Sequence, residues 1–282
     1  MAHADNERPS SENDDLDRTS TKVLPVAAFT GYRSFPAVMN LYANYSGILE
    51  AMTTFKLCGS SASDVLYIAQ IHFGYTSRCP LHFRRGIYLR NGTSLKAPIL
   101  AATGEVFRLP LFLFLFDSKT SVMLPPLDME KNPRDMVTEL LRASITKEQA
   151  VAFRFTVEVG TKRIQREEFE WRKSNGKETG VREKGARYEL RPLATTLSAL
   201  ASSSSSFPPE DGSNILAELT FDNVLSFKHL FTLKLMGAGL TGEMGDRWTL
   251  MVVMTALSIH WLRQNGKTNK PTVAAAQLFN SN

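Results

Sequence analysis

Residues 246–263, DRWTLMVVMTALSIHWLR, decide the fold of this chain. Eleven of the fifteen residues from 248 to 262 are apolar, and the polar ones do not gather on one face of a helix. A helix on the surface of a globular protein keeps a polar face. Asp246 suits an N-terminus, and Arg263 with Gly266 suits a C-terminus. The stretch therefore predicts a helix that is buried on every side or lies in lipid.

Lipid is the first of these two environments. Fifteen helical residues cover about 22 Å, whereas the hydrocarbon core of a bilayer is about 30 Å thick. Trp248 and Trp261 near the ends, with Arg247 and Arg263 outside them, match the border of a membrane span. The alternative to a buried helix is therefore a C-terminally anchored membrane protein, held through helix 246–263.

The rest of the chain favours burial, because its apolar residues alternate as they do in half-buried antiparallel strands. Residues 153–159, FRFTVEV, have this period of two, and Phe169 and Trp171 repeat it in the next run. Asn175-Gly176 then predicts a hairpin turn, and Asn91-Gly92 predicts another. Further strands are expected near 53–58, 65–73, 87–90, 97–102, 105–116, 188–190, 215–221 and 224–235, and a weak helix at 133–143.

Closing such strands into a barrel removes their exposed edges, and a barrel of about a dozen strands can enclose one helix. We therefore predict an all-β fold with one central helix: a closed antiparallel β-barrel of about a dozen strands around the hydrophobic C-terminal helix. The barrel domain is expected at 23–265, with a flexible Ser/Pro-rich loop at 202–213. A disordered acidic arm is expected at 1–22 and a flexible tail at 266–282.

Composition points to a protein of the cytoplasm or the nucleus, and we expect a cytoplasmic protein at or near a membrane surface. Among the 282 residues, Cys58 and Cys79 are the only cysteines, which excludes a disulfide scaffold and a zinc ribbon. The first 22 residues are acidic and contain no apolar signal segment. The net charge of +5 favours contact with phosphate or anionic lipid.

Catalytic motifs are weak. Gly237–Gly242 has the spacing of a dinucleotide loop, but the tail after the helix lacks the acidic residue that such a site needs, so a flexible turn is expected. Residues 59–63 lack the last glycine of a hydrolase elbow. Cys79 with His72 and His82 matches no familiar metal-ligand spacing. We expect no enzyme activity, no cofactor and no metal.

Two segments carry a family resemblance: Glu168-Phe-Glu-Trp-Arg172 with its Asn-Gly turn, and Gly237-Ala-Gly-Leu-Thr-Gly-Glu-Met-Gly-Asp-Arg-Trp248 leading into the apolar helix. Together they resemble fungal members of the tubby C-terminal-like superfamily, which includes LURP-one-related proteins and phospholipid scramblases. The resemblance covers roughly residues 30–265 and implies a barrel around a hydrophobic C-terminal helix. It also implies a non-enzymatic binding or adaptor module, for anionic lipid at a membrane surface.

A basic run around one hairpin supplies the candidate binding residues. They are Lys162, Arg163, Arg166, Arg172 and Lys173. If the hairpin ends share one rim of the barrel, these cations form a patch for a phosphoinositide head group. The competing interpretation is that the neighbouring acids Glu167, Glu168, Glu170 and Glu178 neutralise this surface. We expect a monomer without a nucleic-acid partner, since no aromatic-rich basic motif stands out.

Overall fold

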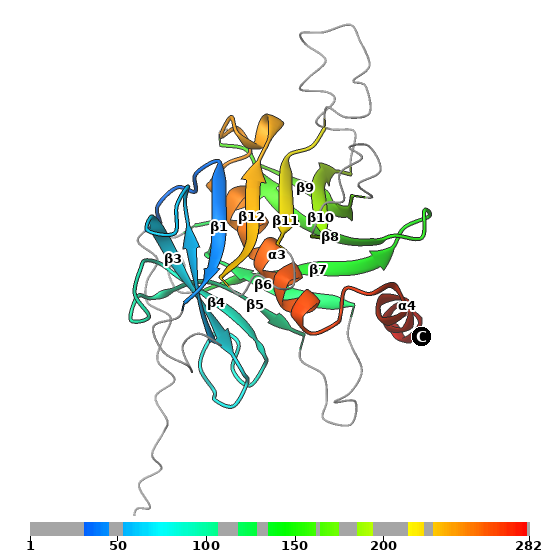
Figure 1. Ribbon diagram of the computed structural model, residues 1–282, viewed down its shortest axis with the longest axis horizontal. Coiled ribbons are helices and arrows are strands. Elements are labelled where there is room, and N and C mark those ends of the chain that lie inside the picture. Colours follow the sequence, from blue (N-terminus) through cyan, green and yellow to red (C-terminus); the bar gives the residue numbers. More distant parts are fainter. Residues whose placement is uncertain are drawn as a thin grey trace, which may run out of the picture.

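Twelve antiparallel strands close into one barrel in the computed structural model of the chain (Figure 1). The structure describes residues 31–44, 53–106, 118–128, 135–161, 164–174, 185–193, 214–222 and 228–280. The acidic arm, the Ser/Pro-rich loop and the Asn175-Gly176 turn lie outside the described residues. The predicted fold class, a closed antiparallel barrel with a C-terminal helix, is confirmed.

The strands follow one another in chain order around the barrel, and each pairs with its neighbours in sequence. They are β1 (Val38–Ala43), β2 (Thr54–Cys58), β3 (Val65–His72), β4 (Gly86–Arg90), β5 (Ile99–Glu105), β6 (Lys119–Leu124), β7 (Val137–Ile145), β8 (Val151–Val159), β9 (Gln165–Lys173), β10 (Arg187–Pro192), β11 (Ala217–Phe221) and β12 (His229–Leu235). The barrel closes where β1 pairs with β12, with Leu41 opposite Phe231.

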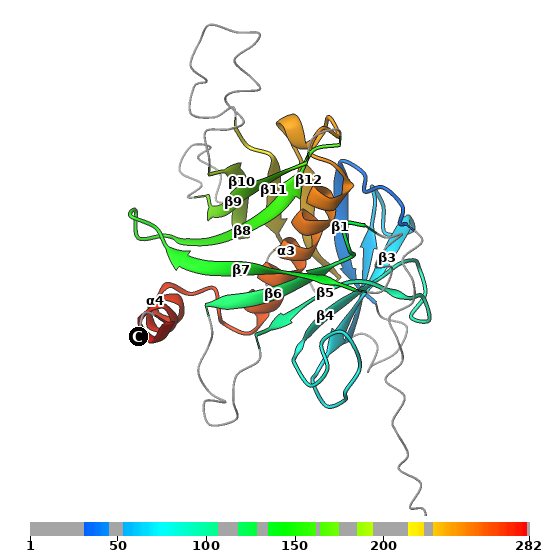
Figure 2. The same cartoon turned by 180° about the vertical axis from the view of Figure 1, so that it is seen from behind.

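The apolar stretch forms helix α3 (Asp246–Gln264), which runs through the barrel (Figure 2). Every residue from Leu250 to Leu262 is buried, as a helix without a polar face requires. Two polar side chains of the helix have hydrogen-bond partners on the strands: Thr255 Oγ1 accepts a hydrogen bond from Trp171 Nε1 at 2.9 Å. The hydroxyls of Ser258 and Thr103 lie 2.5 Å apart.

The strands of the barrel thus cover the side chains that a membrane anchor would present to lipid. Among the described helices, none is both long enough and apolar enough to cross a bilayer.

The helix expected at 133–143 is wrong, because residues from Val137 onward form strand β7. Glu139, Leu141 and Ala143 are buried in alternation, and β7 pairs with both β6 and β8. The residue types favour a helix locally, but backbone hydrogen bonds to two flanking strands outweigh that preference here. Strands β1 and β6 were not expected from the sequence, and most of the strand expected at 105–116 lies outside the described residues.

The flexible tail is also wrong for residues 270–280, which form helix α4 (Lys270–Asn280). Val273 and Ala276 of α4 are buried, and Gln277 Oε1 accepts a hydrogen bond from the backbone N–H of Ile145 at 3.2 Å. The helix therefore packs beside the end of β7 (Figure 1).

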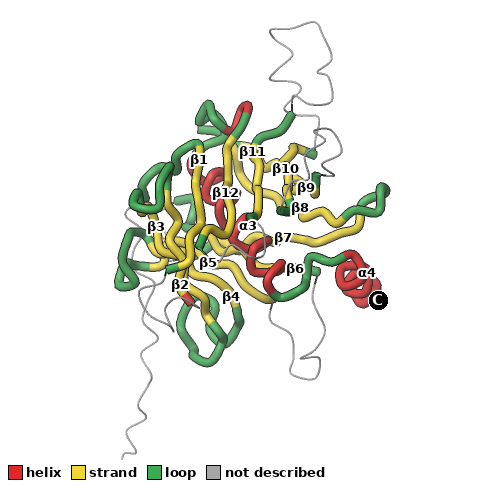
Figure 3. The backbone as a smooth tube through the Cα atoms, in the orientation of Figure 1, coloured by secondary structure: helices red, strands yellow, loops and turns green. Residues whose placement is uncertain are grey.

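The loops that connect the strands lie at the two ends of the barrel (Figure 3). At the Arg247 end, where α3 begins, Gly160 after β8 donates its backbone N–H to Met244 O at 3.1 Å. At the Arg263 end, where α3 finishes, Lys267 Nζ bonds Glu105 at the end of β5 at 3.0 Å. The two names are kept below, because the surface charges differ between these ends.

Candidate functional site

The five sequence-predicted cations do not form one patch. Arg166 and Arg172 both point outward from β9, but they are six positions apart, which is about 20 Å along a strand. Arg166 lies at the Arg247 end, and Arg172 with Lys173 lies at the Arg263 end. The two turns that flank one strand are necessarily at opposite ends of it, which the sequence interpretation overlooked. Lys162 and Arg163 lie outside the described residues.

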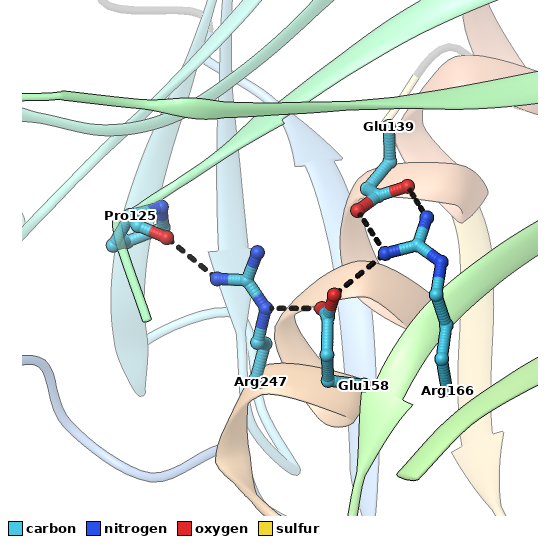
Figure 4. Close-up of polar contacts among 5 residues, drawn as sticks. All are labelled: Pro125, Glu139, Glu158, Arg166 and Arg247. Atoms are coloured by element: carbon cyan, nitrogen blue, oxygen red, sulfur yellow. Dashed lines mark hydrogen bonds and ion pairs between the residues drawn. The ribbon is translucent and has the colours of Figure 1, made fainter. Parts of the chain in front are cut away.

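Arg166 is held by two carboxylates (Figure 4). Its Nη1 donates to Glu139 Oε1 at 2.9 Å and to Glu158 Oε1 at 2.6 Å, and its Nη2 donates to the second oxygen of Glu139. The hydrogen bond to Glu139 is the main reason why the pKa of Arg166 is raised. Glu139 is buried and Arg166 is half exposed. The positive charge of Arg166 is therefore paired with a carboxylate that lies beneath it.

Arg247, at the start of α3, joins the same network (Figure 4). Its Nε donates to Glu158 Oε2 at 2.9 Å and its Nη1 donates to Pro125 O at 2.5 Å. Burial alone would raise the pKa of Glu158, but the hydrogen bond from Arg247 and the nearby positive charges lower it overall. The two arginines and two glutamates are neutral in sum and fix α3 to β7, β8 and β9. This network is structural.

Arg172 shares one carboxylate with a second arginine. Arg154 Nε donates to Glu170 Oε2 at 2.5 Å, and Arg172 Nε donates to the other oxygen of Glu170. The Glu170 side chain is only 1% exposed, so one buried negative charge meets two cations. This cluster keeps a net positive charge beside the exposed Lys173, at the Arg263 end.

The neutralising glutamates of the competing interpretation behave differently from one another. Glu170 does neutralise part of the positive charge, as described above. Glu167 is buried, and its Oε2 has no hydrogen-bond partner within the described part of the chain. Burial raises the pKa of Glu167, so this carboxyl is not one of the surface acids. Glu178 lies outside the described residues.

A second basic segment, which the sequence interpretation missed, connects β3 to β4. We call residues 73–85, FGYTSRCPLHFRR, the β3–β4 loop; it holds three arginines and neither aspartate nor glutamate. Arg78 and Arg85 are exposed. Arg84 donates from Nε to Leu81 O and from Nη2 to Pro80 O, both at 3.1 Å. A charge count over a short window, combined with aromatic content, would have found this segment at the Arg263 end.

A small apolar cluster anchors the β3–β4 loop to the barrel. Leu81 is fully buried and packs with Tyr88, Ala102 and Met123. Tyr88 donates its hydroxyl to Arg78 O at 2.9 Å, and the backbone N–H of His82 donates to the same carbonyl at 2.6 Å. The loop is therefore held against the barrel, and the side chains of Arg78 and Arg85 are exposed on it.

An Asp-His-Thr arrangement lies at the seam between β1 and β12. Asp222 Oδ2 and His229 Nδ1 are 2.8 Å apart, and His229 Nε2 lies 3.3 Å from Thr232 Oγ1. The Thr232 hydroxyl donates to Asn40 Oδ1 at 2.8 Å, and Asn40 Nδ2 donates to Gly59 O at 2.7 Å. Because the Thr232 proton is directed to Asn40 and away from the imidazole, this arrangement joins strands and is not set up for attack.

The thiol of Cys79 lies 3.6 Å from His82 Nε2. Burial raises the pKa of Cys79, which opposes the thiolate that nucleophilic attack or metal binding needs. Among the described residues, no cluster of three or more potential metal ligands occurs.

The glycine-rich segment before α3 allows close packing of the backbone. Gly237–Gly239 forms a short 3₁₀ turn, η2. A Cβ atom at Gly239 would lie 2.4 Å from Leu216 O and 2.9 Å from the Trp248 ring. The glycine therefore lets the chain pass between these groups into the barrel.

Comparisons with protein-family models, with curated proteins and with solved structures gave no match. The class of this protein is defined by its architecture, a closed twelve-stranded antiparallel barrel with a helix inside. Its two ends differ in charge: carboxylates pair Arg166 and Arg247 at one end, and the arginines of an acid-free loop lie at the other.

Proposed function

We propose that the protein is a non-enzymatic binding or adaptor module that contacts anionic phospholipid, including phosphoinositides, at the surface of a cytoplasmic membrane. Such a role is what the resemblance to the tubby C-terminal-like superfamily implies. Because α3 fills the barrel, a ligand of this kind would be met on the outer surface. The observation that carries the proposal is the acid-free β3–β4 loop, whose Arg78 and Arg85 are exposed at the same end as Lys173.

The expected binding is electrostatic. A basic residue close to an anionic membrane contributes about 1 kcal/mol, and this attraction decays within about 8 Å at physiological salt. Removing three such residues should weaken binding by about 3 kcal/mol, which corresponds to about a hundredfold in Kd.

The test is sedimentation with vesicles of phosphatidylcholine alone, with phosphatidylserine, or with a phosphoinositide. We expect the protein to sediment with both charged vesicles, and added salt to release it. The triple variant Arg78→Ala, Arg85→Ala, Lys173→Ala should bind about a hundredfold more weakly.

The matched control removes three exposed cations from or near the Arg247 end: Arg33→Ala, Lys96→Ala, Lys234→Ala. It changes the net charge equally, so a loss confined to the first variant assigns binding to the Arg263 end. Equal sedimentation of the unmutated protein with charged and neutral vesicles would end the lipid proposal.

A further inference from the structure

Three aromatic side chains of the β3–β4 loop are exposed. Phe73 is 37% exposed, Phe83 is 65% exposed and Tyr75 is 81% exposed. Single exposed apolar residues are ordinary on protein surfaces, but three within one short loop form a patch that water solvates poorly. Such a patch marks a surface that another phase or partner covers.

The loop brings the backbones of these three residues close together. Gly74 lies between two of them in sequence, and a Cβ atom on it would lie 2.4 Å from Phe83 O. The backbones at Gly74 and Phe83 are thus in direct contact, and only glycine allows this approach. The rings of Phe73 and Tyr75 lie 6.1 Å apart and nearly parallel, at 18°.

The exposure of these rings does not follow from a loosely held loop. The Leu81 cluster, the Tyr88 hydroxyl and the side chain of Arg84 all hold the loop backbone, and His72 Nε2 forms a further hydrogen bond with His82 O. A surface that is already ordered loses little conformational entropy when it binds. Apolar groups held outward on a rigid support are suited to insertion.

The charges in and near the loop select the partner. Arg78 lies between Tyr75 and Phe83 in the sequence and Arg85 follows Phe83, and the loop has no acid that an anionic surface would repel. Aromatic side chains beside basic ones are typical of segments that lie in the interfacial layer of a bilayer.

We infer that the β3–β4 loop is a membrane-insertion loop: it places Phe73, Tyr75 and Phe83 in the interfacial layer of a bilayer that contains anionic phospholipid. Arg78 and Arg85 then lie at the level of the phosphates. This inference rests on the proposed function and adds a mode of binding and an orientation. The Arg263 end faces the membrane, and an apolar contribution remains when salt screens the charges.

The first test compares two double variants. Tyr75→Ser with Phe83→Ser removes two exposed rings from the loop, and Ile164→Ser with Leu240→Ser removes two exposed apolar side chains at the Arg247 end. On vesicles of phosphatidylcholine with phosphatidylserine, we expect the loop variant to bind at least about tenfold more weakly than the unmutated protein. The control should bind as the unmutated protein does. Thermal melting of both should be unchanged, because the removed side chains are exposed.

A second measurement detects insertion directly. Phe83→Trp introduces an indole into the loop, whereas the three natural tryptophans are buried in the barrel. We expect the introduced fluorescence to shift to the blue on charged vesicles and to be quenched by lipids with brominated acyl chains. The unmutated protein measures the background from the buried tryptophans.

The outcomes separate this inference from the function on which it rests. If the unmutated protein binds charged vesicles, and the loop variant binds equally without quenching of the introduced indole, insertion is overturned and electrostatic binding stands. If the unmutated protein does not bind charged vesicles, both are overturned. Insertion is also overturned if the loop variant unfolds at a lower temperature than the unmutated protein. That result would mean that the rings pack against other parts of this chain. The same holds if the loop variant changes the oligomeric state, or if the rings are needed for binding RNA and not vesicles.

Discussion

His260 lies in the barrel among the rings of Phe55, Phe221 and Phe231, with centroid distances of 5.6, 6.2 and 5.8 Å. Its Nε2 has no hydrogen-bond partner in the described part of the chain. Burial, with a smaller effect from the positive charge of Arg263, lowers the pKa of His260 to about 4. The folded protein thus keeps this imidazole neutral where an exposed histidine would gain a proton.

The depressed pKa makes stability sensitive to acid. In the unfolded chain His260 binds a proton near pH 6.5, whereas in the folded protein it does so only near pH 4. Protonation of His260 therefore does not lower the free energy of unfolding above about pH 6.5. As the pH falls toward about 4, the free energy of unfolding decreases by about 3 kcal/mol, because only the unfolded chain gains the proton. Urea unfolding at neutral and acidic pH should show a smaller acid-induced loss for His260→Phe. Equal losses in both proteins would show that another group is responsible.

At the scale of elements, α4 tests whether the end of the described chain contributes to stability. The helix buries Val273 and Ala276 and accepts one backbone hydrogen bond from β7 through Gln277. Its apolar residues were not recognised as a helix face in the sequence, because the segment is short and ends in polar residues. Their burial depends on the neighbouring strand.

Deletion of residues 269–282 should therefore destabilise the protein. Loss of one buried valine and one hydrogen bond costs about 2–3 kcal/mol, which lowers Tm by about 5–10 °C in a domain of this size. Differential scanning calorimetry measures the change. The control is Leu278→Ser, because Leu278 is 72% exposed on the same helix and its loss should have little effect. An unchanged Tm after the deletion would show that these residues behave as a flexible tail and do not stabilise the barrel.

At the scale of the whole molecule, the seam between β1 and β12 closes the barrel and removes the last two strand edges. Asn40 reaches across it to Thr232 and His229, far apart in the sequence. Closure thus depends on contacts between the two ends of the barrel domain, and local sequence does not encode them.

Two truncations at the start of the chain should have opposite results. Deletion of residues 1–22 removes the acidic arm and should change Tm by less than about 2 °C, since the arm has few apolar residues to pack. Deletion of residues 1–43 also removes β1, which exposes the edges of β2 and β12 to other chains. Light scattering should show aggregation for the longer deletion only. A folded monomer without β1 would show that the seam is dispensable.

Local periodicity was sufficient to predict the architecture. A helix without a polar face and strands of period two are properties of neighbouring residues, and both identify which side chains must be buried. The sequence therefore determined that a closed barrel surrounds helix 246–263. It did not determine β7 or α4, because there local preference was weak and neighbouring strands decided the outcome.

The distribution of charge was decided only by the tertiary structure. The partners of Arg166 are Glu139 and Glu158, which lie on two other strands, and strand register alone brings them together. The direction of β9 likewise places Arg166 and Arg172 at opposite ends, although they are six positions apart. The sequence determined which residues carry charge. Which charges stay unpaired, and at which end, depends on long-range strand pairing, because ion pairs form between residues that are close in space and not in the chain.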